Sequence, residues 1–117
     1  GDDVPQVTAG TPMREAIYEM SRKKLGITAV TDETGVLTGC ISDGDLRRAL
    51  ERDEAVLART AGDCAQPRPR TIDGGELAAA ALKEMEDNRI TSLFVTDPTG
   101  RIEGILHLHD LWRLELF

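Results

Sequence analysis

The chain repeats itself at a spacing of 65 residues, and this repeat constrains the fold more than any other feature. Aligned without a gap, Val30-Thr31-Asp32 meets Val95-Thr96-Asp97, and Asp45-Leu46 meets Asp110-Leu111. Each half has roughly 55 residues, and a unit of that size buries too little surface to be more than marginally stable alone. We therefore expect two similar units that fold together.

The first copy predicts two helices that flank a strand hairpin. Apolar residues at i, i+3, i+4 and i+7 indicate an amphipathic helix, namely Met13, Ala16, Ile17 and Met20. Thr11 is placed as its N-cap, Pro12 at its first helical position, and Gly26 after its end. The other expected elements are a short strand near Val7, a strand over 27–31, a turn over 32–35, a strand over 36–41 and a helix over about 42–52.

The second copy predicts the same order of elements. We expect a short strand around Ile72, a helix over about 76–87, a strand over 92–96, a turn over 97–100, a strand over 101–107 and a last helix from about His109. Each copy is then β-α-β-β-α, and the fold class is α+β with helices packed on small mixed sheets. The expected domains are repeat 1 over 1–52, an Arg- and Pro-rich connector over 53–70, and repeat 2 over 71–117.

Composition excludes several classes of function. With 14 Lys and Arg against 21 Asp and Glu, the formal charge of −7 has the wrong sign for binding a nucleic-acid backbone. No apolar run is long enough to span a membrane. Cys40 and Cys64 fit neither a disulfide framework nor a metal-ligand spacing, so we expect free thiols and a cytoplasmic location. The start GDDVPQV suggests a piece of a longer protein.

One junction between strand and helix carries a family pattern. The run Gly39-Cys40-Ile41-Ser42-Asp43-Gly44-Asp45 resembles the CBS domain, which usually occurs in tandem, and the resemblance covers essentially the whole chain. The strings SDGDLRR at 42–48 and HLHDLWR at 107–113 resemble the C-terminal CBS pair of D-arabinose-5-phosphate isomerases. The resemblance implies a regulatory module whose two repeats form a pseudo-twofold pair. It also implies an N-terminal sugar isomerase domain as partner, in a protein of the lipopolysaccharide pathway that makes the Kdo sugar.

Ser42 and Asp45 are the first candidate site residues. The CBS resemblance implies that Ser42 contacts a phosphate and that Asp45 binds ribose hydroxyls, which a carboxylate beside a helix N-terminus could do. The same spacing is close to a capping box, in which Ser42 caps the helix and Asp45 lies in its first turn. Both roles can coexist.

The second copy departs from this pattern. His107 replaces the Ser or Thr, while Asp110 keeps the carboxylate. A histidine could be a pH-dependent phosphate contact, since its usual pKa is near 6.5. His107 and His109 could instead contact the isomerase domain that the resemblance implies. A metal is a weaker alternative for these two histidines, because no third ligand of matching spacing accompanies them. We expect no metal.

Further candidates flank these motifs. Arg47 and Arg48 suit a phosphate or a sugar carboxylate, or else form a solvated helix face paired with Asp43 and Glu51. The CBS resemblance implies that the strands over 28–31 and 92–96 line the ligand cleft and contact a base through their backbone groups; alternatively they are simply buried strands. Their candidate residues are Thr28, Ala29, Val30, Leu93 and Phe94.

Two functions remain open. In the first, the chain binds a nucleotide or nucleotide sugar, with AMP, ATP or CMP-Kdo as candidate ligands, and shifts a neighbouring catalytic domain between states. In the second, it is a structural scaffold for oligomerisation with no bound ligand. Self-association into a homodimer or larger assembly is expected in either case, and no cofactor is required. Independent catalysis is disfavoured, because the sequence has no P-loop, no GxGxxG after a strand and no paired nucleophile and base.

Overall fold

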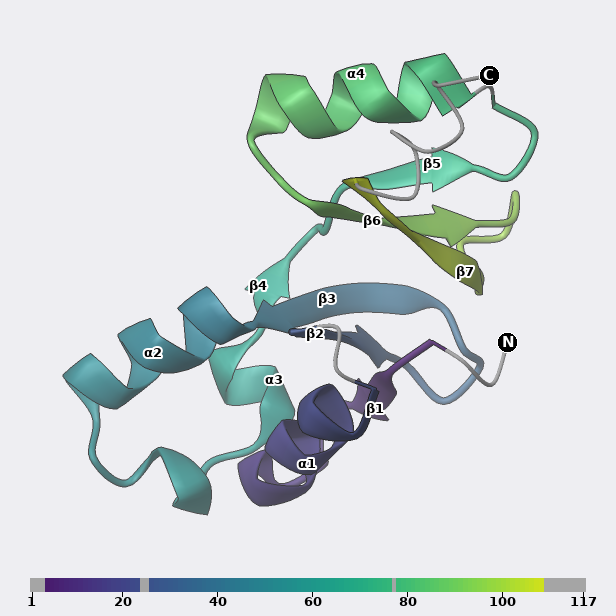
Figure 1. Cartoon of the computed structure of the whole chain (residues 1–117). Coiled ribbons are helices and arrows are strands. Elements are labelled where there is room, and N and C mark those ends of the chain that lie inside the picture. Colours follow the sequence, from purple (N-terminus) through teal and green to yellow (C-terminus); the bar gives the residue numbers. More distant parts are fainter. Residues whose placement is uncertain (1–3, 24–25, 77, 109–117) are drawn as a thin grey trace. The chain divides into compact units, whose positions relative to one another are not determined.

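The computed structural model describes residues 4–23, 26–76 and 78–108, without the side chains of residues 23 and 78 (Figure 1). The chain divides into two compact units, Gly1–Pro69 and Arg70–Phe117. Each unit contains one sheet and its own helices. None of the described helices is long and apolar enough to cross a membrane.

The first unit contains a four-stranded mixed sheet in the order β1-β2-β3-β4. β1 (Gln6–Thr8) is parallel to β2 (Ile27–Thr31), which pairs antiparallel with β3 (Leu37–Ser42). β4 (Gln66–Pro67) pairs antiparallel with the outer edge of β3. The parallel pair requires a crossover connection, and α1 (Met13–Lys23) supplies it.

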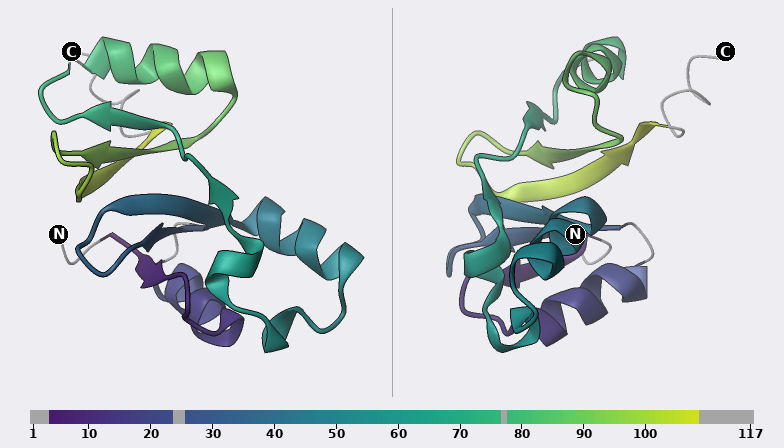
Figure 2. Two further views of the ribbon diagram at one scale, coloured as in Figure 1. Left: turned by 180° about the vertical axis from the view of Figure 1, so that it is seen from behind. Right: turned by 90° about the vertical axis from the view of Figure 1, so that its left-hand side faces the viewer.

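The helices of this unit bury one face against the sheet. α2 (Asp43–Arg52) follows β3, and the short helices η1 (Val56–Ala58) and α3 (Ala61–Cys64) lead from it to β4, as the two views of Figure 2 show. Their apolar residues form one core with α1 and the sheet: Met13, Ala16, Met20, Val30, Ile41, Ala49, Val56, Ala61 and Cys64. The apolar stripe predicted for the first helix is therefore the stripe that faces the core.

The second unit contains a three-stranded sheet in the order β5-β6-β7. β5 (Thr71–Asp73) is parallel to β6 (Ser92–Thr96), and β6 pairs antiparallel with β7 (Ile102–His107). α4 (Ala78–Asn88) connects the parallel strands. The hydrophobic core of the second unit contains Ile72, Ala81, Met85 and Leu93.

The sequence repeat extends to individual hydrogen bonds. In the β2–β3 turn, Oδ1 of Asp32 accepts from the N–H and hydroxyl of Thr34 and from the N–H of Val36. In the β6–β7 turn, Asp97 accepts in the same way from Thr99 and from the N–H of Arg101. The threonine hydroxyl contributes most to lowering the pKa of each aspartate. The two hairpins are thus structural copies.

Most of the predicted elements are confirmed, and the strand over 92–96 has the predicted bounds. The N-cap prediction was wrong by one residue, because α1 begins at Met13. Pro12 instead forms an isolated bridge with Thr60, and the Thr11 hydroxyl accepts a 3.1 Å bond from the N–H of Thr8. The predicted last helix, from His109, lies outside the described residues.

Residues 53–70 contain structure that no local pattern indicated. The segment expected as a connector holds η1, α3 and β4, and β4 belongs to the sheet of the first unit. β4 is only two residues long and contains Pro67, so its own sequence does not indicate a strand. It is a strand because it pairs with β3, which lies far from it in the sequence.

Candidate functional site

Ser42 and Asp45 lie where β3 ends and α2 begins, and they form a reciprocal capping box. The Ser42 hydroxyl accepts from the N–H of Asp45 at 3.1 Å, and Oδ2 of Asp45 accepts from the N–H of Ser42 at 2.9 Å. Two N–H groups that the start of a helix would leave unpaired are satisfied in this way. The capping role of these residues is confirmed, and their ligand role stays a prediction.

Arg48 completes this arrangement. Its Nη2 donates to Oδ1 of Asp45 at 2.7 Å, so both oxygens of that carboxylate are already bonded. Asp45 is only 6% exposed, whereas Arg48 is 57% exposed. The guanidinium passes over Gly44, where a Cβ would lie 3.3 Å from Nη1 of Arg48. The site therefore presents a buried carboxylate covered by an accessible cation.

The alternative for Arg47 and Arg48 was a solvated helix face paired with Asp43 and Glu51. The structure confirms only that both arginines are exposed. Arg48 pairs with Asp45, not with the predicted Asp43 or Glu51, because its side chain turns back toward the start of the helix. Arg47 is exposed and has no hydrogen-bond or ion-pair partner within 4–23, 26–76 and 78–108. Among the described residues, Arg47 therefore has an unpaired guanidinium on α2, while the guanidinium of Arg48 is paired with Asp45 and more than half exposed.

The candidate residues on the strands are all buried. Thr28, Ala29 and Val30 on β2 are buried, and Val30 belongs to the core beneath α1. Leu93 and Phe94 on β6 are buried as well, with Leu93 in the core beneath α4. The expectation that these are buried strands is confirmed, and contact with a ligand remains untested.

His107 occupies the position that Ser42 has in the first repeat, and its ring is held within the sheet. Its Nδ1 lies 2.9 Å from the hydroxyl of Ser92, which faces it across the β6–β7 pair. In the first repeat Ile27 faces Ser42 in the same register. A serine thus accompanies the histidine at the paired position. His109 and Asp110 lie outside the described residues.

The backbone link from strand to helix is the same in both repeats. The N–H of Asp43 donates to the carbonyl of Gly26 at 3.0 Å, and the N–H of Leu108 donates to that of Thr91 at 2.9 Å. These pairs differ by the 65-residue spacing. The two copies therefore differ at this junction in side-chain chemistry, and share its backbone geometry.

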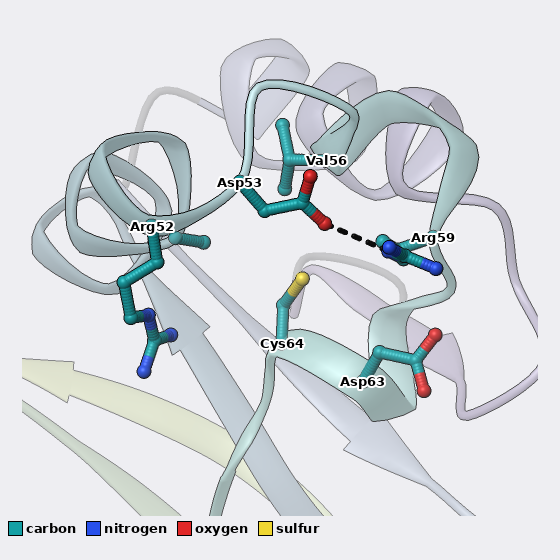
Figure 3. A pocket seen from close by; sticks show the side chains of 7 residues that line it. Arg52, Asp53, Val56, Arg59, Asp63 and Cys64 are labelled. Carbon is teal, nitrogen blue, oxygen red and sulfur yellow. Dashed lines mark hydrogen bonds and ion pairs between the residues drawn. The ribbon is translucent and has the colours of Figure 1, made fainter.

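A pocket of about 320 Å³ in the first unit was not predicted (Figure 3). An ion pair of 2.8 Å joins Asp53 and Arg59 across it, and Arg59 lowers the pKa of Asp53. The sulfur of Cys64 points into it, and burial raises the pKa of this thiol. The lining residues are Ala49, Arg52, Asp53, Val56, Arg59, Asp63 and Cys64. Apart from Arg52 at the end of α2, its charged residues belong to the segment interpreted as a connector, and no sequence motif marked the pocket.

Comparison with known proteins agrees with the repeat. The family model for the CBS domain matches residues 2–52 and again residues 61–111. Arabinose 5-phosphate isomerase KdsD of Pseudomonas aeruginosa is 47% identical over 113 residues, which are 97% of this chain and 35% of that protein. The Escherichia coli KdsD is 36% identical over 97% of this chain and 34% of its own length. The chain spans about a third of these relatives.

Solved structures share the fold. The CBSX2 protein in complex with AMP superposes with a TM-score of 0.84 at 23% identity, over 98% of this chain and 89% of that one. The CBS domain protein PAE2072 of Pyrobaculum aerophilum, complexed with AMP, has a TM-score of 0.82 at 20% identity, over 97% and 92%. At this level of identity the likeness establishes the architecture alone.

Proposed function

The chain belongs to the CBS domain family, and from this membership we propose that it is the nucleotide-binding regulatory part of a longer arabinose 5-phosphate isomerase. Two relatives of that name, at 47% and 36% identity, support the assignment of the longer protein. Its activity, its place in Kdo and lipopolysaccharide synthesis, and a cytoplasmic location are parts of the same proposal. So are the division into repeats over 1–52 and 71–117 and assembly into a homodimer or larger oligomer.

The observation that carries the proposal is the Ser42, Asp45 and Arg48 arrangement at the start of α2. The N-terminus of a helix carries partial positive charge and favours a phosphate. Arg48 is more than half exposed and could exchange part of its contact with Asp45 for a phosphate oxygen. Each carboxylate oxygen of Asp45 keeps a further lone pair, which could accept from a ribose hydroxyl.

We propose a nucleotide as the ligand because this arrangement pairs an anion-binding group with an acceptor for hydroxyls. Structures with AMP among proteins of this fold support AMP or ATP. CMP-Kdo is the alternative, since the end product of the pathway would give feedback control. Such control requires that the ligand bind two states of the longer protein with different affinity.

The two repeats would then contribute unequally. The Ser42 hydroxyl accepts from the N–H of Asp45 and could still donate its own hydrogen to a phosphate oxygen, whereas Nδ1 of His107 is bonded to the hydroxyl of Ser92. We propose that repeat 1 supplies the phosphate contact. Roles of His107, His109 and Asp110 toward ligand or isomerase domain remain predictions of the sequence.

A thermal-shift titration with AMP, ATP, CMP and CMP-Kdo tests the proposal. A ligand at one hundred times its Kd adds about 2.7 kcal/mol to the free energy of unfolding, which raises the Tm measurably. Asp45→Ala should lower the Tm without ligand and abolish the ligand-induced rise. Asp63→Ala is the matched control, because Oδ2 of Asp63 accepts from the N–H of Thr60 in the capping box of α3. It should lose stability and keep the rise.

One observation favours the second candidate, a scaffold without ligand. Both oxygens of Asp45 already have partners inside the chain, so capping alone accounts for that residue. No rise in Tm with any of the four ligands would support the scaffold. A rise that survives in Asp45→Ala would place the ligand elsewhere.

A further inference from the structure

The pocket beside Cys64 is separate from the Ser42, Asp45 and Arg48 arrangement, because none of those three residues lines it. It lies between the end of α2, η1 and α3, all within the first unit. Its volume of about 320 Å³ is near the lower end of the range, roughly 300–1,000 Å³, in which pockets hold small molecules. A pocket of this size suits a small metabolite rather than a large cofactor.

Arg59 presents hydrogen-bond donors that no described residue uses. Its Nε donates to Oδ2 of Asp53 at 2.8 Å, and its Nη groups have no acceptor among the described residues. The side chain is 54% exposed. Because the guanidinium is held at Nε, its outer edge stays open, and this planar edge matches a carboxylate or a phosphate.

Arg52 adds a second cation to the lining. It lies in the last turn of α2, is exposed, and forms no hydrogen bond or ion pair with the described residues. Figure 3 shows Arg52 and Arg59 on opposite sides of the Cys64 sulfur. Burial and then the charge of Asp63 raise the pKa of this thiol, whereas the charges of Arg52 and Arg59 lower it. Both guanidinium groups are therefore close enough to act on a negative charge at the sulfur.

The two carboxylates of the lining differ in what they can still accept. Asp53 is bonded through both oxygens, since Oδ1 accepts from the N–H of Ala55 and Oδ2 accepts from Arg59. Asp63 accepts from the N–H of Thr60 through Oδ2, and its Oδ1 has no donor within the described part of the chain. The lining thus combines several open cationic donors with one open carboxylate oxygen.

A small anion that also carries hydroxyl groups matches this lining. Carboxylate or phosphate oxygens accept from guanidinium groups, and a hydroxyl can donate to Oδ1 of Asp63. The buried Ala49 and Val56 offer an apolar wall for a carbon chain. We propose that this pocket is a second ligand site, for a sugar phosphate or a sugar acid. Arg59 and Arg52 bind its anionic group, and Asp63 binds a hydroxyl.

Alkylation of Cys64 measures occupancy of the pocket, because the sulfur of this residue points into it. Cys40 lies on β3, does not line the pocket, and is the internal reference. With iodoacetamide and peptide mass spectrometry, ribose 5-phosphate or gluconate at about ten times its Kd should slow labelling of Cys64 roughly tenfold. The rate at Cys40 should not change. Inorganic phosphate and ribose, which each carry one part of this chemistry, should protect Cys64 less at equal concentration.

Substitution of Arg59 shows whether the protection depends on its guanidinium. Arg59→Ala should abolish it, and Arg59→Lys, which keeps the charge and loses the planar edge, should weaken it several-fold. The matched control is Arg22→Ala, because Arg22 is 48% exposed and forms an ion pair of 2.8 Å with Glu19 outside the pocket. This control should keep the full protection.

Three results would overturn the proposal: no protection of Cys64 by either ligand, equal protection of Cys40, or protection that persists in Arg59→Ala. Inorganic phosphate protecting as well as ribose 5-phosphate would also overturn it, because the hydroxyls would then contribute nothing. Protection by ribose 5-phosphate alone supports a sugar phosphate, and protection by gluconate alone supports a sugar acid. Failure of AMP to bind at the start of α2 would leave these results unaffected, since Asp45 is not part of the pocket.

Discussion

Replacing Asp45 by alanine should destabilise the chain by about 2–3 kcal/mol. The substitution removes the bond from the Ser42 N–H and the contact with Arg48. A hydrogen bond to a charged group contributes roughly 1.5–3 kcal/mol, and an ion pair with an exposed partner roughly 0.2–1 kcal/mol. The loss lies below the sum of these upper values, because Arg48 is 57% exposed and regains hydration. Urea denaturation with an unchanged m-value measures the difference.

Two variants show how this energy divides. Asp45→Asn keeps a carbonyl that can accept from the Ser42 N–H and loses the charge facing Arg48, so it should cost about 1 kcal/mol. In a double-mutant cycle, Ser42→Ala with Asp45→Ala should destabilise by less than the sum of the single changes, because each side chain caps the other's backbone. A loss for Asp45→Ala under about 0.5 kcal/mol, the usual range for a surface change, would refute this account of the capping box.

Three further predictions concern stability and reactivity. Stability should fall in acid, because the folded-state pKa of Asp32 and Asp97 lies below 3.8 and the stability that these groups contribute is lost as the pH falls through it. In Asp32→Ala the urea midpoint should therefore decrease less steeply at low pH than in the unchanged chain, and an equal decrease would contradict this. Cys40 should react slowly with iodoacetamide at neutral pH and faster in urea, since burial raises its pKa to about 11; rapid labelling of the native chain would contradict this. Met85→Ala, at a fully buried site, should cost about 2–5 kcal/mol in urea denaturation, and the exposed Leu50→Ala much less, so equal losses would oppose the core assignment.

The sequence was sufficient for the parts of the fold that depend on local pattern. The stripe of Met13, Ala16 and Met20 predicted α1, and the matching turns after Val30 and Val95 predicted both hairpins. These features are set by contacts within a few residues or by burial of one face. Their positions were therefore readable to within about a residue.

The sequence was insufficient where distant residues decide. β4 is a strand only because β3 lies beside it, and the start of α1 is displaced because Pro12 pairs with Thr60. The pocket beside Cys64 is formed by residues whose spacing carries no motif. At the candidate site, sequence indicated both possible roles of Asp45, and only the geometry showed that Arg48 occupies its second oxygen.

Titrating the isotopically labelled chain with AMP, and following its amide resonances, tests the central proposal most directly. We expect shifts centred on 42–48, at the start of α2, that disappear in Asp45→Ala and persist in the matched control Asp63→Ala. Absence of shifts at 42–48, or shifts there that persist unchanged in Asp45→Ala, would contradict the proposal that this capping box binds a nucleotide.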